Sequence, residues 1–520
     1  MLGPIVGHTT DTTTRIWIAA DGGEHRLELE GGPTVAFRPT EAGVPEFGTA
    51  IADATGLMAD TCYRYTIRAA DGAVAARGAL RTFPPPRDRT GLIFASASCD
   101  SLDVAGDRPN RGAWDLLAER VRRGELRFLV LLGDQVYMDE VENIWNLPLD
   151  IDRRERRRRM ARVYHRFWSR APVAEILANV PTYMIWDDHE IRNGWGSDPG
   201  DSPTLARRYP RGRPIGARYE AFFEDARQVY WHFQHVRNPA TPGIDAAAFQ
   251  EAGTRRAQPF VFACGSTALL MLDNRGARDV WRDRLPVLGE VQWNALRRML
   301  DDLDASTDSL VVVVPLPVVS MPNRGLVQIM FGRRRDDVRL FRRGQAAKLK
   351  VFPEQGDPTS GGSKLLVYLR AVVDVAGALM FGLCSTGRFH LKDLTDVRDN
   401  WSHHLVRRER DALLRAVLAV RQDGRAVSFI GGDLHVGARI DIVERGGAPV
   451  PTLITSGIGQ APSGGPAVHT VLGRHFRIAH GLRARLIEHC VAHNFGLTRI
   501  RRTRGAPEIT HELVRAKSDE

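Results

Sequence analysis

Two patterns of apolar and polar residues divide the chain near residue 88. Residues 1–88 contain short segments in which apolar and polar side chains alternate, and DGG, GGP and DG turn sequences separate them. Alternation with frequent turns is typical of strands that bury one face in a β-sandwich. We therefore expect a small all-β domain over residues 1–88.

A change of pattern follows this domain. The segment Pro84–Asp88 reads PPPRD, and three consecutive prolines end any strand and stiffen the connection. From Gly91 onward, apolar runs alternate with helical stretches, which is the signature of an α/β domain. Within the first domain, Tyr63 and Tyr65 resemble the late strands of a fibronectin type III-like sandwich. We expect an α/β domain over residues 91–505 and a C-terminal tail over residues 506–520.

Four apolar runs in the second domain end in residues that can bind metals. The run at 128–132 shows no alternation, so it predicts a strand covered on both faces, as in a mainly parallel sheet. Open α/β sheets bind ligands beyond the carboxyl ends of their strands, so we expect these side chains to share one pocket. Stretch 91–100 ends in Cys99, and stretch 127–140 ends in Asp134 and Tyr137. Stretch 181–193 ends in Asp187, Asp188, His189 and Glu190, and stretch 426–437 ends in Asp433 and His435.

The remaining pattern predicts the helices and strands that support these loops. Residues 259–274 predict a hairpin, and residues 309–319 predict another buried strand. Closing strands are expected over 492–500 and 508–515. Helices are expected over 113–123, 150–170, 217–235, 288–303 and 399–420, the last of these beginning near Trp401.

Residues 323–396 form an insertion that matches no recognised pattern. Within it, residues 365–383 are apolar and long enough to raise the question of a membrane span. Arg370 and Asp374 lie near the centre of that stretch, and both charges would be costly in lipid. We therefore expect a buried or amphipathic helix and no transmembrane span, with peripheral membrane contact as an alternative.

Composition adds limits on partners and compartment. The chain has 520 residues, a formal net charge of +10 and five cysteines. The positive charge favours an anionic substrate, and it predicts no specific nucleic-acid partner. Few and scattered cysteines argue against a disulfide framework. No export signal is visible at the start, so we expect a cytoplasmic protein, and the sequence does not indicate its oligomeric state.

The candidate metal ligands follow from the chemistry of these side chains. Asp134 lies at the end of the central strand, so its carboxylate is the best candidate to be shared by two cations. A Cys99 thiolate and a Tyr137 phenolate would make one site electron-rich, which suits a trivalent ion such as iron. Asp433 and His435 would complete that site. Each residue alone has a simpler structural interpretation, but the pattern repeats at four predicted strand ends.

A second cation would complete a two-metal centre. Asp188 and Asp134 together would hold a harder ion such as calcium, magnesium or manganese. Two metals about 3.5–4 Å apart can bind a phosphate, activate a water and stabilise the leaving oxygen. His189 follows Asp188 and could protonate the leaving alkoxide. Arg275, at a predicted strand end, either holds two phosphate oxygens or pairs with an acidic neighbour, and the sequence leaves both open.

The segments SCD, GDQVY, WDDHE, LDNR and GDLH, in that order, resemble the alkaline phosphatase D (PhoD-like) family of the calcineurin-like metallophosphoesterases. WDDHE combined with GDLH is the specific part of this signature. The resemblance covers nearly the whole chain, because that family also has an amino-terminal β-sandwich. It implies an α/β fold with a metallophosphoesterase-type β-sandwich core and flanking helices. It also implies hydrolysis of phosphate monoesters or diesters by direct attack of a metal-bound hydroxide.

The resemblance also implies roles for single residues. Arg275 would contact the substrate phosphate, and His189, which matches the histidine of an Asn-His motif in the wider superfamily, would assist the leaving group. Family members are typically exported through a twin-arginine signal, a pattern that the start of this sequence lacks. Fe3+ would be bound by Cys99, Asp134, Tyr137, Asp433 and His435, and Ca2+ by Asp134 and Asp188, with Mn2+ or Mg2+ as alternatives.

Two further functions remain open at this point. A PhoD-like protein with altered catalysis could have a membrane-surface or binding role, which the basic and apolar segments within residues 323–396 would serve. A nuclease is a weaker alternative, because only the positive charge favours it.

Overall fold

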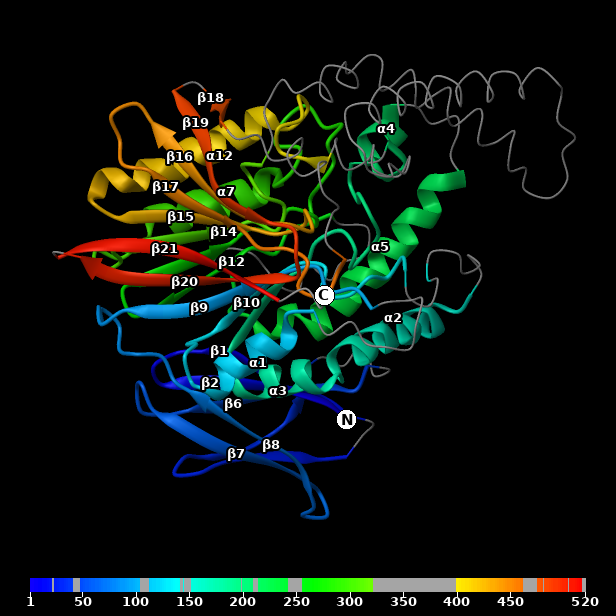
Figure 1. The fold of residues 1–520 in the computed structure, drawn as a ribbon. Helices are drawn as coiled ribbons and strands as arrows, with labels where there is room; N and C mark the ends of the chain where they lie inside the picture. Colours follow the sequence, from blue (N-terminus) through cyan, green and yellow to red (C-terminus); the bar gives the residue numbers. More distant parts are fainter. Residues whose placement is uncertain are drawn as a thin grey trace, which may run out of the picture.

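The fold is that of a computed structural model of the chain (Figure 1). It describes all residues except 21–22, 41–46, 103–111, 141–143, 145–150, 198, 209–213, 242–254, 321–398, 462–474, 480, 504 and 517–520. The predicted insertion at 323–396, including the apolar stretch 365–383, therefore lies outside the described residues. Among the described residues, no helix combines the length and the apolar character that crossing a membrane requires.

The amino-terminal region consists of two four-stranded antiparallel sheets, as the alternating pattern predicts. Their facing sides form a hydrophobic cluster that includes Val6, Ile18 and Leu27. The outer side of the first sheet packs on the rest of the chain, where the Trp17 indole N–H donates to the carbonyl of His232 over 2.9 Å. The first sheet contains β1 (Leu2–Thr9), β2 (Thr13–Ala19), β6 (Thr49–Thr55) and β5 (Arg38–Pro39), and the second contains β4 (Thr34–Ala36), β3 (His25–Leu29), β7 (Cys62–Ala69) and β8 (Val74–Arg81).

A five-stranded sheet follows, and it combines strands from both ends of the second region. The neighbouring strands β9, β10 and β11 are parallel. β20 pairs with β9 in antiparallel orientation, with Gly496 opposite Ser96. In order across the sheet, the strands are β11 (Thr182–Ile185), β10 (Leu129–Leu132), β9 (Leu92–Ala97), β20 (Asn494–Thr503) and β21 (Ala506–Arg515).

An eight-stranded sheet packs against the five-stranded one and completes the central sandwich. β13, β14, β15 and β17 are parallel neighbours at its centre. In β14, Val311 and Val313 face the inter-sheet core, while Leu310 and Val312 face the helices on the other side. The order across the sheet is β12 (Phe260–Cys264), β13 (Thr267–Met271), β14 (Ser309–Val313), β15 (Ala426–Gly431), β17 (Val450–Ile454), β16 (Gly437–Glu444), β19 (Leu482–Cys490) and β18 (His475–Ala479).

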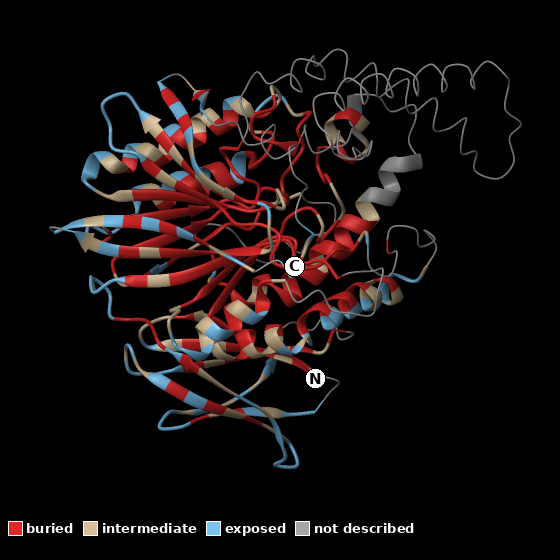
Figure 2. Cartoon of the chain, in the orientation of Figure 1, coloured by how far each residue is buried: buried red, intermediate tan, exposed pale blue. Residues whose placement is uncertain are grey.

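Helices cover both outer faces of this sandwich. α7 and α12 contribute Trp293, Leu296 and Leu413 to the hydrophobic core on the outer side of the eight-stranded sheet. Figure 2 shows that the strands between the helical layers are almost wholly buried, while the loops far from the site are exposed. The helices are α1 (Trp114–Arg122), α2 (Arg153–Trp168), α3 (Ala171–Asn179), α4 (Pro203–Arg208), α5 (Pro214–Phe233), α7 (Gly289–Asp301) and α12 (Arg407–Ala419), with short 3-10 turns at Pro199–Asp201, His235–Arg237 and Val420–Asp423.

Two elements differ in their bounds from the sequence predictions, and the predicted closing strand is confirmed. β14 ends at Val313, before Pro315, which has no backbone N–H to extend the sheet. α12 begins at Arg407 and not near Trp401, because the side chain of Asn400 accepts from the backbone of Ser402 and holds a turn there. Residues 508–515, predicted to be a closing strand, lie in strand β21, which is paired along its length with β20.

Candidate metal centre

The predicted metal ligands lie at the carboxyl ends of strands from two different sheets. Cys99, Asp134 and Asp188 follow β9, β10 and β11 of the five-stranded sheet. Asp433 and His435 follow β15 of the eight-stranded sheet. The site therefore lies where strand-end loops of both sheets meet, which agrees with the rule that α/β sheets bind ligands beyond the carboxyl ends of their strands.

Four of these residues have a left-handed backbone conformation. The φ angle is 60° at Cys99, 54° at Asp134, 64° at Asp433 and 52° at His435. Residues other than glycine rarely adopt such angles, and each instance costs on the order of 1–3 kcal/mol. Of the seven non-glycine residues with positive φ in the described part of the chain, four are therefore candidate ligands. Backbone strain is thus concentrated at the strand-end turns of this site.

Gly133 allows two of the loops to approach each other. It precedes Asp134 and has a φ of 91°. A Cβ atom at this position would lie 2.3 Å from Cβ of Asp187, which is a steric clash. Only glycine fits between the loops after β10 and β11, so this residue sets how closely their carboxylates can lie.

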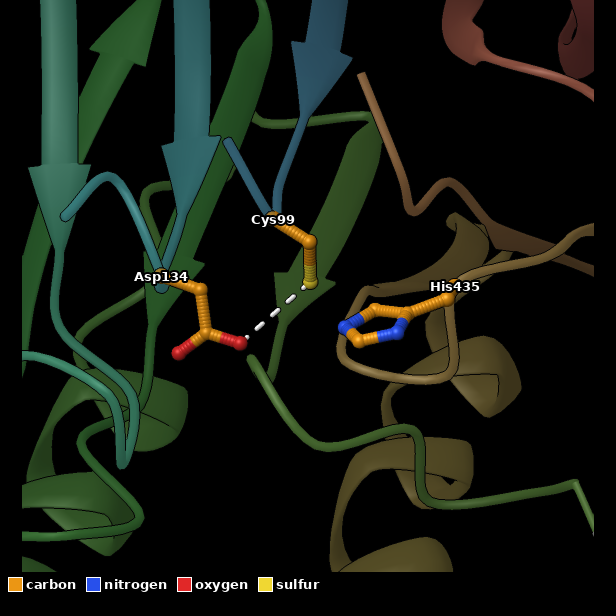
Figure 3. A group of neighbouring side chains, drawn as sticks. All are labelled: Cys99, Asp134 and His435. Carbon is orange, nitrogen blue, oxygen red and sulfur yellow. Dashed lines mark hydrogen bonds between the residues drawn. The ribbon is translucent and has the colours of Figure 1, made fainter. Parts of the chain in front are cut away.

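Cys99, Asp134 and His435 form the first cluster of candidate ligands, and Figure 3 shows their side chains converging from three separate loops. The Cys99 thiol donates to Oδ2 of Asp134 over 3.3 Å. The hydroxyl of Tyr137 lies 3.2 Å from Nε2 of His435. Ser456 links the group, because its hydroxyl donates to Sγ of Cys99 over 3.1 Å and accepts from the backbone N–H of His435 over 2.8 Å.

A second cluster consists of carboxylates and shares Asp134 with the first. One oxygen each from Asp134, Asp187, Asp188 and Asp433 lies within 4.8 Å of the others. Oδ2 of Asp187 and Oδ1 of Asp188 are buried and have no hydrogen-bond partner among the described residues. Buried carboxylate oxygens without donors are costly, and a cation supplies the missing partner.

The pKa values of the acidic groups are raised, which shows that their negative forms lack a sufficient counter-charge. Burial, together with Cys99 and Asp188, raises the pKa of Asp134 well above its usual value. Burial also raises the pKa of Asp433, with Asp187 and Asp188 contributing, and it raises the pKa of the Cys99 thiol to about 12.

The imidazole of the first cluster is shifted in the opposite direction. Burial, with a smaller effect of His189, lowers the pKa of His435 to about 3, so this ring is neutral and can donate a lone pair. Neutral imidazole, carboxylates, a thiol and a phenol form a donor set that fits two cations, and bound cations would favour the deprotonated forms of the acidic members.

His189 lies beside both clusters. Its ring packs on Tyr137 with centroids 4.1 Å apart. Its Nδ1 lies 2.7 Å from Oδ1 of Asp139, whose other oxygen accepts from the backbone of Asn193. Burial alone would lower the pKa of His189, but the charges of Asp139 and Asp188 outweigh burial and raise it to about 10. This histidine is therefore oriented by a carboxylate.

Arg275 is placed differently from the role that the family resemblance assigned to it. The side chain is fully buried, and each guanidinium nitrogen already has a protein partner. Nε pairs with Asp187, Nη1 donates to the carbonyl of Trp195, and Nη1 and Nη2 donate to Asp399 over 2.8 and 2.6 Å. The structure therefore shows the ion pairs, and a contact of Arg275 with the substrate phosphate stays a prediction.

The sequence prediction assigned no role to several residues that the structure brings to the site. Asp187 and Glu190 lie inside the WDDHE segment, and Asp139 follows GDQVY. Their positions in or beside these motifs were the sequence signal that could have identified them as site residues. Asp399 and Ser456 follow no strand-end motif that was recognised. Only the folded structure reveals their contacts.

Comparisons with known proteins agree with this geometry. Residues 94–310 match the family described as PhoD-like phosphatase. The solved structure of PhoD aligns with 98% of this chain and 89% of its own, at 12% sequence identity and a TM-score of 0.59, which shows a common fold. Purple acid phosphatase PPD1 from yellow lupin (Lupinus luteus) seeds aligns with 95% of this chain and 69% of its own, at 10% identity and a TM-score of 0.47.

No curated protein sequence matches the chain. The resemblance inferred from the motifs is nevertheless confirmed, because the matched range contains GDQVY, WDDHE and LDNR. Residues 94–310 are thus similar to the PhoD-like phosphatases, and this match supports a phosphoric ester hydrolase.

Proposed function

We propose that this protein hydrolyses phosphate monoesters or diesters by in-line attack of water at a centre of two metal ions, Fe3+ with Ca2+. Mn2+ and Mg2+ are the alternatives for the harder site. The observation that carries the proposal is the convergence of a thiol, a phenol, an imidazole and several carboxylates in two clusters that share Asp134.

We assign the ligands to the two ions by their chemistry, and Asp433, which lies in the carboxylate cluster, is assigned to iron. Cys99, Tyr137, Asp433 and His435 would hold iron, since thiolate and phenolate donors suit a trivalent ion. Asp188 would hold the harder ion, and Asp134 would bind both. When bound, two such cations orient the phosphate, lower the pKa of a water and neutralise charge on the leaving oxygen.

His189 would act as the acid that protonates the leaving alkoxide. Asp139 binds Nδ1 and orients the ring, so Nε2 is the nitrogen that exchanges the proton. One ring nitrogen of His189 lies within 4.8 Å of carboxylate oxygens of Asp134 and Asp188, and this proximity supports the proposed role. A carboxylate that orients a histidine in this way also stabilises its protonated form.

Removal and return of metals test this proposal. Purified protein is expected to contain iron and calcium by element-specific analysis, to lose hydrolysis of aryl phosphates and bis-aryl phosphates after chelation, and to regain it with iron plus calcium. Relative rates on the two substrates would show which ester class is preferred. A folded, metal-loaded protein that hydrolyses neither substrate would contradict the proposal.

Replacement of His189 by glutamine tests the role of the acid. The side chain keeps a polar end but cannot transfer a proton, so kcat is expected to fall by about 10²- to 10⁴-fold. Metal content should stay unchanged, and the loss should be smaller for substrates with better leaving groups. His511→Gln is the control, because His511 is also buried and bonds to Ser428 and Thr498 away from the clusters. Equal losses for all leaving groups would argue against the assigned role.

A further inference from the structure

The buried carboxylate of Glu190 connects the two loops that carry the acidic ligands. Its Oε2 accepts from the backbone N–H groups of Asp134 and Asp187, both over 2.9 Å. Its Oε1 accepts from the backbone N–H of Gln135 over 2.9 Å. One side chain on the β11 loop therefore binds three backbone groups, two in the β10 loop and one in its own.

Gln234 anchors this carboxylate from a third direction. Its Nε2 donates to Oε1 of Glu190 and to the hydroxyl of Tyr164, both over 3.0 Å. Gln234 directly follows α5 and Tyr164 lies on α2, and all three side chains are buried. The position of Glu190 is thus fixed by the helical layer, and Glu190 in turn fixes the loops.

This geometry bears directly on metal affinity. The carboxylate cluster requires oxygens of Asp134, Asp187 and Asp188 to remain close together although like charges repel. Asp134 and Asp187 are the residues whose backbones Glu190 binds, so their separation depends on it. Glu190 itself belongs to none of the ligand groups found among the described residues, and each of its oxygens already accepts two hydrogen bonds.

We propose that Glu190 is a positioning residue that sets metal affinity by fixing the distance between the β10 and β11 loops. This inference rests on the proposed function, because it requires that the clusters bind metal. Partners of metal ligands commonly change metal affinity by about 10- to 100-fold when they are replaced, and an effect of that size is expected here.

Two substitutions separate geometry from charge. Glu190→Asp keeps the negative charge but is one methylene shorter, so it cannot reach both loops. Glu190→Gln keeps the length, but its NH2 group meets a backbone N–H donor and loses at least one of the three backbone bonds. If position matters, both variants bind metal more weakly. If only charge matters, Glu190→Asp binds as the unmodified protein does.

Glu409 provides a matched control. It is also a buried carboxylate that accepts from two backbone N–H groups, those of Val287 and Leu288, and from the indole N–H of Trp293. It lies on α12, and these hydrogen bonds reach none of the ligand loops. Glu409→Gln should therefore reduce thermal stability about as much as Glu190→Gln while leaving metal affinity unchanged.

The experiment is a calorimetric titration of the metal-free full chain with Mn2+, together with thermal unfolding of the same samples. The expected result is an increase in Kd of about 10-fold or more for Glu190→Asp and Glu190→Gln, and none for Glu409→Gln. Unchanged affinity in Glu190→Asp, or an equal loss in Glu409→Gln, would overturn the inference.

A second variant covers the case in which the Glu190 variants do not fold. Gln234→Met removes the anchor of the carboxylate and leaves its charge, so Kd for Mn2+ should rise in the same direction, and an unchanged Kd would overturn the inference. Failure of the proposed function would appear in the unmodified protein, as absence of Mn2+ binding. Failure of the inference about Glu190 would appear only in the variants.

Discussion

Replacing Asp134 by asparagine is expected to weaken binding of both metal ions by more than about 100-fold, and to abolish hydrolysis with it. Replacing a partner of a ligand already costs about 10- to 100-fold, and Asp134 is a candidate ligand in both clusters. Asparagine has the same shape and keeps an oxygen that can accept from the backbone of His189. The measurements are metal content after purification, Kd for Mn2+, and rates with an aryl phosphate.

The same substitution is expected to stabilise the metal-free protein by about 1 kcal/mol, since burial and the neighbouring acidic groups disfavour the ionised carboxylate of Asp134. Asp225→Asn is the control. Asp225 is equally buried but pairs with Arg153 and Arg156, so its loss should destabilise the fold and leave metal binding intact. Retention of both metals by Asp134→Asn would remove Asp134 from its assigned role.

Replacing Arg275 by methionine is expected to lower the free energy of unfolding by about 3–5 kcal/mol, because it leaves the buried carboxylates of Asp187 and Asp399 without their counter-charge. Burial raises the pKa of Asp187 to about 6 even with Arg275 beside it, so the loss should be larger at pH 8 than at pH 5. The sign follows from linkage. Below a pH of about 6, Asp187 is largely protonated in the folded protein and has little need of a counter-charge, whereas above that pH it is charged and the variant has no Arg275 to pair with it. Chemical denaturation at the two pH values measures it.

This result would also decide between the two interpretations of Arg275. If Arg275 contacts the substrate, the variant has a higher KM and unchanged stability. If Arg275 only forms ion pairs, the variant has lower stability and an unchanged KM. Arg410→Met is the matched control, because Arg410 is buried but its partner Asp411 is partly exposed to solvent and can be hydrated. A smaller loss of stability is therefore expected there. A large rise in KM for Arg275→Met, in a protein of normal stability, would restore the role in substrate binding.

The sequence predicted most of the candidate site because its signals are local. The apolar run before Asp134 is covered on both faces, and a turn with a metal-binding side chain follows it. The same arrangement recurs before Cys99 and Asp433. A strand that is buried on both faces has a continuous run of apolar residues in place of alternating apolar and polar ones, so a short apolar run was sufficient to identify these strands.

Other features depend on contacts between distant segments, and local patterns do not report them. The division of the ligand-bearing strands between two sheets is set by strand pairing. Asp399 follows a long segment that no pattern explained, and only folding brings its carboxylate to Arg275. A strand-end arginine gives the same sequence signal whether it binds phosphate or an aspartate, so the choice between these roles required the packed structure.

The pairing of β9 has a consequence for how the protein is made. β9 leads into Cys99 and pairs with β10 on one side and with β20 on the other. β20 is translated long after β9, so the nascent chain presents one open, apolar edge of β9 until β20 has left the ribosome. Open edges of this kind pair readily with other chains, and a message that ends before codon 494 would yield an aggregation-prone product.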